Sequence, residues 1–135
     1  MNWYLKVLRN YTDFSGRARR REFWMFILFN FIFLTIAAVI DNVLGITFDD
    51  TFIVWDTTFK IKTTLFGYGV TPNGYVYLIY SLSVLVPAVA VLIRRLHDVG
   101  KSGWFSLIPV YNLILVCTDG VKGDNLYGAD PKPIA

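Results

Sequence analysis

The segment Arg94–Trp104, which reads RRLHDVGKSGW, separates two apolar runs and decides how the rest of the chain is arranged. It contains the single histidine of the sequence, and in it an arginine pair shortly precedes an aspartate. Its Gly100–Gly103 portion combines two glycines with Lys and Ser, a composition at which a helix is expected to end and turn. We therefore interpret residues 94–103 as a polar corner between two helices.

The composition favours a membrane protein. Of the 135 residues, 55% are hydrophobic and 17% are aromatic, which is more apolar than an ordinary soluble domain of this length. The apolar residues come in blocks, as expected of segments that cross a bilayer. Cys117 is the single cysteine, so no internal disulfide can form. One histidine and one cysteine also argue against a closed zinc site, which takes four N or S ligands.

Two apolar runs are long enough to cross a membrane as helices. Residues 23–40 are almost uninterrupted by polar side chains, and about 18 residues make roughly 27 Å of helix. We expect this run to be retained as a span, because it is longer than the apolar region of a cleaved signal peptide. Residues 75–93 form the second span. Asn30, in the first, is expected to face a neighbouring helix, where its amide can find a partner.

Positive charges gather on one side of these two spans. Lys60 and Lys62 lie in the loop of residues 41–74, whereas nine basic residues flank the other ends of the spans. Because basic loops stay inside the cell, this asymmetry predicts a cytoplasmic N-terminus and a cytoplasmic corner at residues 94–103. The nine are Lys6, Arg9, Arg17, Arg19, Arg20, Arg21, Arg94, Arg95 and Lys101.

Residues 1–14 favour a short helix that lies in the membrane interface. Aromatic and apolar side chains share one helical face, and basic side chains lie mostly opposite, as in interfacial helices. The alternative is a helix packed on the protein's own cytoplasmic side. Beyond it, Ser15 can cap the helix that follows. The apolar face consists of Trp3, Val7, Tyr11 and Phe14.

The outer loop, residues 41–74, contains a strand-like pattern. Apolar and polar residues alternate over residues 59–65, which predicts a strand. Residues 52–54 can supply a partner strand, with a turn near Asp56, so we expect a small β-hairpin. The glycines and the proline of residues 67–74 then mark turns back to the membrane.

The third apolar run, residues 104–117, is shorter than the first two. About 14 residues make roughly 21 Å of helix, less than the bilayer core, and Pro109 and Asn112 lie inside the run. It either spans by thinning the bilayer locally or enters and returns, and the pattern favours a span. The polar tail, residues 118–135, ends in a Pro-Lys-Pro sequence. The predicted fold is thus an all-α integral membrane protein with two transmembrane helices, a short third apolar helix, an interfacial N-terminal helix and a small outer hairpin.

Three stretches of the chain resemble one known family, the bacterial inner-membrane "domain of unknown function 805" family. Residues 14–24 (FSGRARRREFW) resemble its N-terminal basic motif, residues 94–104 its central signature, and residues 123–131 (GDNLYGADP) its closing motif. The opening residues 3–8 also look similar. The outer loop looks long and the third apolar run short for this family. The resemblance implies an inner-membrane protein and brings no biochemical activity.

No catalytic, cofactor-binding or metal-binding residue is predicted. His97 next to Asp98 suggests an acid–base pair, but adjacent side chains on a helix point about 100° apart. Neither Ser102 nor Cys117 has a base arranged beside it as a nucleophile needs. The Gly-Lys-Ser triplet of residues 100–102 lacks the upstream glycine and the preceding strand of a phosphate-binding loop.

The charged residues of the motifs predict a structural network. Because charges near a low-dielectric boundary tend to pair, we expect Glu22 to pair with the Arg94–Arg95 dipeptide. We likewise expect Asp98 to pair with an arginine of residues 17–21. The candidate interaction residues are Arg17, Arg20, Arg21, Glu22, Trp24, Arg94, Arg95, His97, Asp98, Ser102, Trp104, Asn125, Tyr127 and Asp130.

These observations favour a small non-enzymatic membrane protein that acts through lipid or protein contacts at its basic face. Its expected partners are anionic lipid headgroups, a further copy of the chain or another membrane protein, and nucleic acid is not expected. The second hypothesis is a subunit of an oligomeric transporter or channel, although no ionisable residue lies mid-span. The third is a membrane enzyme that acts on lipid headgroups through His97 and Asp98.

Overall fold

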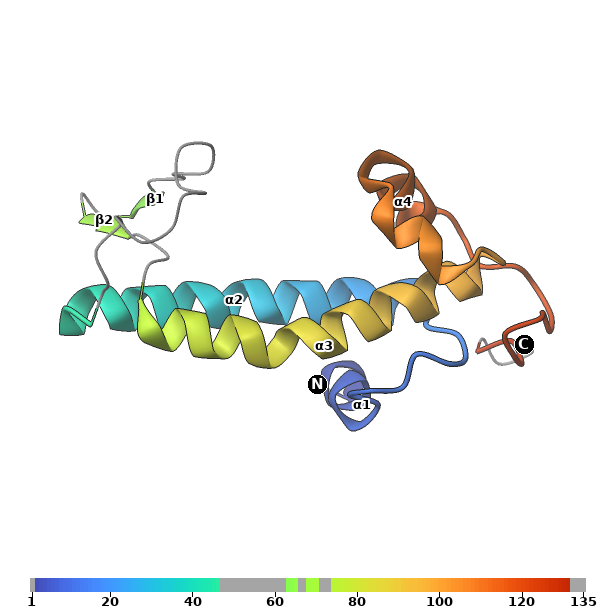
Figure 1. Cartoon of the computed structure of the whole chain (residues 1–135), viewed down its shortest axis with the longest axis horizontal. Helices are drawn as coiled ribbons and strands as arrows, with labels where there is room; N and C mark the ends of the chain where they lie inside the picture. Colours follow the sequence, from blue (N-terminus) through green and yellow to red (C-terminus); the bar gives the residue numbers. More distant parts are fainter. Residues whose placement is uncertain (1, 47–62, 66–67, 71–73, 132–135) are drawn as a thin grey trace. The chain divides into compact units, whose positions relative to one another are not determined.

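The computed structural model describes residues 2–46, 63–65, 68–70 and 74–131, and helices dominate these residues (Figure 1). The chain divides into two compact units, Met1–Phe29 with Leu85–Ala135, and Asn30–Val84, which we call the polar unit and the loop unit. The elements are α1 (Asn2–Arg9), α2 (Arg20–Leu44), β1 (Thr63–Leu65), β2 (Tyr68–Val70), α3 (Tyr75–Asp98), the 3-10 helix η2 (Gly103–Leu107) and α4 (Pro109–Cys117).

The helices α2 and α3 are long and apolar enough to cross a membrane. They have 25 and 24 residues, or roughly 37 and 36 Å, against a hydrocarbon core of about 30 Å. Many of their large apolar side chains are exposed, such as Phe31 and Ile79, as expected of surfaces that face lipid. The predicted fold class, an all-α integral membrane protein, is confirmed, and both helices extend beyond the predicted spans.

The start of the expected corner is helical, because α3 continues to Asp98. The helix then ends at Gly100, whose φ of 74° suits a residue without a side chain. The amide of Gly100 donates to the carbonyl of His97 at 3.0 Å, and that of Lys101 donates to the carbonyl of Leu96 at 3.0 Å. This pair of bonds is a Schellman motif, so the helix ends at the predicted glycine.

In the loop unit, α3 begins beside a buried carboxylate at the end of α2. The two oxygens of Asp41 accept hydrogen bonds from the amides of Val76 at 3.1 Å and Tyr77 at 2.8 Å. Residue 74 must be glycine here, because a Cβ at Gly74 would lie 2.0 Å from the Asp41 carboxylate. Within the same unit, the hydroxyl of Tyr80 donates to Asn30 at 2.8 Å, which confirms the expected partner on a neighbouring helix.

The β-hairpin of the loop unit contains a strand pair that was not predicted. β1 pairs antiparallel with β2, with Thr63 opposite Val70 and Leu65 opposite Tyr68. Gly69, expected in a turn, therefore lies in a strand, because the local partner is reached through a much shorter loop. The predicted partner strand at residues 52–54 lies outside the described residues.

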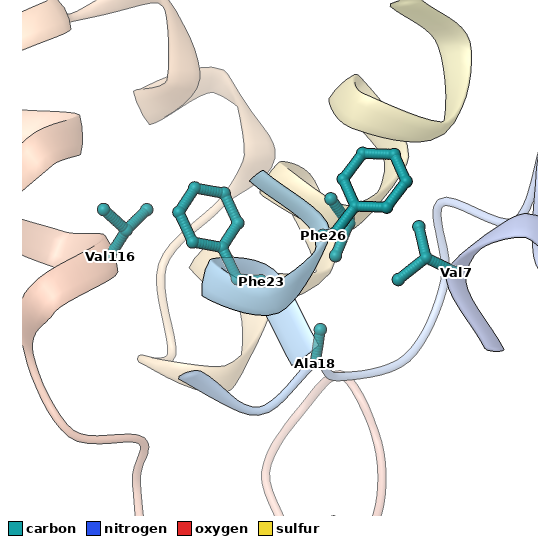
Figure 2. Packing of buried hydrophobic residues seen from close by; sticks show 6 residues of the cluster. Val7, Ala18, Phe23, Phe26 and Val116 are labelled. Atoms are coloured by element: carbon teal, nitrogen blue, oxygen red, sulfur yellow. The ribbon is translucent and has the colours of Figure 1, made fainter. Parts of the chain in front are cut away.

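The core of the polar unit joins α1 to α2 (Figure 2). Val7 and Phe26 are fully buried, and the rings of Tyr4 and Phe26 stack with centroids 5.5 Å apart. The helix is shorter than the predicted 1–14, and it packs on the protein as the alternative interpretation expects; its place in the membrane interface stays a prediction. The buried cluster consists of Val7, Ala18, Phe23, Phe26, Val91 and Val116.

The third apolar run is not one continuous helix. η2 precedes α4, and Pro109 starts α4, since proline cannot donate the hydrogen bond that would continue the preceding turn. The nine residues of α4 rise only about 14 Å. Leu115 and Val116 are its buried residues, while most of its other side chains are exposed. A helix of this length cannot cross a bilayer core by itself.

Candidate functional site

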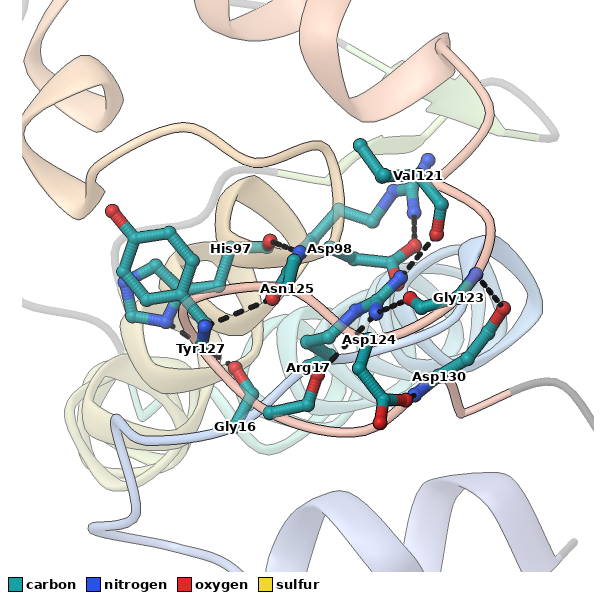
Figure 3. Close-up of polar contacts among 12 residues, drawn as sticks. Gly16, Arg17, His97, Asp98, Val121, Gly123, Asp124, Asn125, Tyr127 and Asp130 are labelled. Carbon is teal, nitrogen blue, oxygen red and sulfur yellow. Dashed lines mark hydrogen bonds and ion pairs between the residues drawn. The ribbon is translucent and has the colours of Figure 1, made fainter.

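The three sequence motifs meet in the polar unit, and Arg17 lies at their centre (Figure 3). Its side chain is 1% exposed, and its Nε donates to Oδ1 of Asp98 at 3.0 Å. Its Nη1 donates to the carbonyl of Gly123 at 2.6 Å and its Nη2 to that of Val121 at 2.5 Å. One guanidinium thus joins the first motif to the end of α3 and to the tail. The predicted pairing of Asp98 with an arginine of residues 17–21 is present.

A second arginine, Arg95, completes the surroundings of Asp98. It is fully buried, its Nη1 donates to the other carboxylate oxygen of Asp98, and its Nη2 donates to the carbonyl of Thr118. The tail passes so close to Asp98 that a Cβ at Gly120 would lie 2.1 Å from Oδ2. Both oxygens of this buried carboxylate therefore have cationic partners, as a buried charge requires.

The last backbone carbonyls of α3 bond to the other motifs. The carbonyl of Arg94 accepts from the amide of Ala18 at 3.0 Å, and that of Asp98 accepts from the amide of Val121 at 2.9 Å. The carbonyl of His97 accepts from the side-chain amide of Asn125 at 2.9 Å. A helix end leaves its last carbonyls without intrahelical donors, and for Asp98 a residue distant in sequence, Val121, supplies one.

His97 is held between the first and third motifs. Its Nδ1 lies 3.2 Å from the carbonyl oxygen of Gly16, which can only accept, so Nδ1 carries the proton. Its ring stacks on that of Tyr127 at a centroid distance of 4.0 Å and an angle of 4°. Asp98, next in sequence, points to Arg17 instead. The two neighbours do not form an acid–base pair with each other, as the helical geometry predicts.

The closing motif folds into a compact loop around Asn125. Asn125 and Gly128 form an isolated β-bridge, and the Asn125 side chain accepts from the amide of Tyr127 at 2.9 Å. Asp130 closes the loop, because it accepts from the amide of Gly123 at 2.9 Å while its own amide donates to Asp124 at 3.1 Å. Within this loop, the carbonyls of Gly123 and Gly128 accept hydrogen bonds from Arg17.

A separate ion pair involves Glu22, which is completely buried at the start of α2. Lys6 of α1 donates to it at 2.9 Å, and Nη1 of Arg94 lies 3.8 Å from its other oxygen. The predicted contact with the Arg94–Arg95 dipeptide is present. The contribution of Lys6 was not predicted, because the favoured interpretation placed residues 1–14 in the membrane interface.

The segment between α1 and α2 differs from the prediction. Ser15 does not cap a helix, since α2 begins at Arg20. Its amide and hydroxyl donate to Asp13 instead, and these two hydrogen bonds lower the pKa of Asp13. A serine beside a turn can satisfy an aspartate as readily as a helix start, so composition alone did not separate the two roles.

A basic pocket of about 610 Å³ lies beside this cluster. Arg20 reaches Asp119 across it at 3.1 Å, with both side chains substantially exposed. Four of the predicted residues line it, namely Arg20, Arg21, Trp24 and Arg95. Of the others, Trp104 is 79% exposed outside the pocket, and Ser102 makes no side-chain cap to η2. The pocket is lined by Arg19, Arg20, Arg21, Trp24, Met25, Arg95, Asp119 and Gly120.

The described residues include no group of three His, Cys, Asp or Glu side chains that could hold a metal ion. The candidate site consists of paired charges beside a basic pocket. Gly120, Thr118 and Val121 were not predicted as participants, because they act through their backbones. Such roles leave no signal in residue type, except for the glycine itself.

Comparisons with known proteins agree with the motif resemblance. Residues 11–129 match the family described as "Protein of unknown function (DUF805)". The chain is 38% identical to "Inner membrane protein YhaH" of Escherichia coli (strain K12) over 98% of both chains. It is also 38% identical to "Inner membrane protein YhaI" of the same organism, over 98% of this chain and 97% of the relative. No solved structure matches the chain.

Proposed function

The chain belongs to the DUF805 family, and from that premise we propose that it is an inner-membrane protein with a basic cytoplasmic face. In this proposal α2 and α3 cross the bilayer, and both chain ends lie in the cytoplasm. The protein acts without catalysing a reaction, through contacts of its basic face with lipids or with other membrane proteins.

The path of the tail supports two crossings. Residues 121–128 bond to Arg17, which precedes α2, and to the end of α3. The intervening α4 is too short to cross, so the run of residues 104–117 enters the membrane and returns. The N-terminal segment and the tail then share one side. The nine basic residues that flank these ends support a cytoplasmic location for that side.

The charged groups of the central cluster are already paired with one another, which supports a non-enzymatic role. Both oxygens of Asp98 are paired with arginines, and His97 is stacked on Tyr127 with Nδ1 directed to a backbone carbonyl. A general base must reach a substrate proton, and the paired carboxylate of Asp98 has no such reach. The cluster instead holds the basic face in shape.

The basic pocket is the single observation that carries the contact function. Three consecutive arginines at the start of a membrane-length helix line a hollow of about 610 Å³, together with Trp24 and Met25. Arginine binds phosphate and carboxylate groups through paired N–H donors. Trp is a common residue at headgroup depth. This chemistry suits an anionic partner at the membrane surface.

The structure offers less to the transporter hypothesis. Asn30 is bonded to Tyr80, and the hydroxyls of Thr35, Ser81 and Ser83 donate to carbonyls of their own helices. Each of these four side chains thus has a hydrogen-bond partner within the described residues, so they do not favour a polar path.

Photocrosslinking in intact cells tests the proposed contact role. A photoreactive amino acid is placed at Arg21, on the pocket wall, or at Leu126, which is 99% exposed outside the pocket. We expect the residue at position 21 to form adducts with lipid or with one defined protein well above the level at position 126. Equal adduct formation at both positions would contradict the proposal.

A further inference from the structure

Two neighbouring hollows of the polar unit share one wall residue. The basic pocket includes Trp24, and a second groove of about 370 Å³ includes the same Trp24. Each volume falls within the range of about 300–1,000 Å³ that is usual for ligand sites. Trp24 itself is 41% exposed. It therefore forms the boundary between one hollow of basic character and another of apolar character.

The second groove is apolar and is built by three helices. α2 contributes Phe23, Trp24 and Ile27, and one turn of α3 faces the same space. α4 closes the groove with Pro109 and Leu113. Apart from Asn112, its lining side chains are apolar. A groove of this kind at the level of the spans suits a hydrocarbon chain.

The basic pocket carries an excess of positive charge. Its lining has four arginines and one aspartate, Asp119. Arg95 is already paired with Asp98, and Asp119 pairs with Arg20. Since the Arg20–Asp119 pair is half exposed, it is worth little and is easily exchanged. A phosphate group can replace the Asp119 carboxylate on Arg20, because both present oxygens to the guanidinium fork.

We propose that the two hollows form one site for a single anionic glycerophospholipid drawn from the surrounding membrane. The phosphate headgroup binds among Arg19, Arg20 and Arg21, and one acyl chain lies in the groove of α2, α3 and α4. Trp24 lies at the boundary between head and chain. The proposal rests on the proposed function, and it narrows a basic face in general to one lipid class and one location.

Native mass spectrometry of the full chain in detergent measures the binding directly. The probes are phosphatidylglycerol, phosphatidylcholine and inorganic phosphate. We expect retention of one phosphatidylglycerol molecule, weaker phosphatidylcholine binding and no stable complex with inorganic phosphate. Retention of phosphate as strong as that of the lipid would overturn the acyl-chain part of the site.

Paired variants locate the site. Arg20→Gln with Arg21→Gln removes two charges from the pocket, and Arg9→Gln removes an exposed charge of α1 outside it. Because each basic residue near an anionic surface contributes about fivefold to binding, we expect the double variant to lose at least about tenfold in affinity. Arg9→Gln should change it less than about twofold. Equal losses would overturn the site.

Two further variants test the ends of the site separately. Asp119→Asn removes the competing carboxylate, so we expect it to raise phosphatidylglycerol affinity by about fivefold. Leu113→Trp fills the groove and should lower the affinity for phosphatidylglycerol. Val110 is exposed on α4 and does not line the groove, so Val110→Trp should leave the affinity unchanged. No effect of Leu113→Trp, or a loss with Asp119→Asn, would contradict the proposed placement.

Lipid binding by the unmodified protein distinguishes failure of the proposed site from failure of the proposed function. If the unmodified protein prefers phosphatidylglycerol but pocket and control variants behave alike, the specific site is wrong and a diffuse basic face remains. If the unmodified protein shows no preference for anionic lipid, lipid contact itself is wrong as the role of the basic face.

Discussion

The two units each bury one aspartate at an end of α3, but they satisfy it in different ways. Asp41 is bound by two backbone amides at the helix start, where the helix dipole favours a negative charge. Asp98, at the helix end, is bound by Arg17 and Arg95, because amide donors are not available there. The first solution connects two neighbouring helix ends. The second uses arginines as partners, and Arg17 thereby connects segments that lie more than eighty residues apart in the sequence.

The largest effect is predicted for removal of an arginine that pairs with Asp98. Arg17→Ala removes one of two cationic partners from a buried carboxylate, and breaking a buried pair costs about 3–5 kcal/mol. We expect a corresponding drop in the free energy of unfolding, together with protease cleavage of the released tail. Denaturant unfolding in detergent and limited proteolysis measure both effects.

A matched charge removal controls for this prediction. Arg20→Gln breaks an exposed pair, which is worth about 0–1 kcal/mol, and should leave the tail protected. A loss with Arg20→Gln as large as that with Arg17→Ala would show that net charge, and not the buried pair, stabilises the unit.

A smaller effect is expected at the other aspartate. Asp41→Ala removes the acceptors of two amides at a helix start, a loss of about 1–3 kcal/mol. No buried arginine is left unpaired by this change, so the free energy of unfolding should fall less than with Arg17→Ala. Tail proteolysis should remain as in the wild type. Protease cleavage of the tail in Asp41→Ala would contradict the view that the two aspartates stabilise separate parts of the molecule.

The glycine beside each aspartate sharpens the comparison. A Cβ would lie 2.1 Å from the Asp98 carboxylate at Gly120 and 2.0 Å from the Asp41 carboxylate at Gly74. We expect each change to alanine to cost about 1–3 kcal/mol by overpacking, as measured by thermal unfolding. Gly103→Ala is the control, since its Cβ would meet a side-chain carbon of Ile93 at 3.0 Å. A larger cost at Gly103 would be evidence against the close approach of the two carboxylates.

The smallest predicted effect concerns the stacked pair. His97→Ala removes the stack on Tyr127, which is worth about 0.5–1.5 kcal/mol beyond the buried area. His97→Phe keeps the stack and removes the ring nitrogens, so it should restore most of the lost stability. Growth of the native host should be unchanged by His97→Phe. Failure of growth with a stably folded His97→Phe protein would favour a chemical role for the histidine.

Charge pairing could be predicted from the sequence, whereas backbone contacts could not. The contacts of Asp98 with Arg17 and of Glu22 with Arg94 follow from the rule that charges near a membrane pair with each other. The carbonyls of Val121 and Gly123 carry no residue-type signal, so the tail's contact with Arg17 had no basis in composition. Pro109 lies where α4 begins, yet the path of the tail depends on contacts distant in sequence.

The same distinction explains the errors elsewhere. The alternation over residues 59–65 includes β1, but the pairing of β1 with the nearby β2 was not predicted. The expected partner at residues 52–54 lies outside the described residues. Ser15 was assigned to a helix start because serine favours that position, but its amide and hydroxyl donate to Asp13 instead. Local patterns identified element types, and competition among partners decided where the elements begin and what they contact.

The central claim is that the tail returns to the side of the arginines, and labelling with a membrane-impermeant maleimide tests it most directly. In a Cys117→Ser background, single cysteines are placed at Lys60, Lys101 and Leu126, the last being 99% exposed. The account predicts labelling of position 60 in intact spheroplasts and of positions 101 and 126 only after permeabilisation. Labelling of position 126 in intact spheroplasts, with position 101 protected, would contradict it.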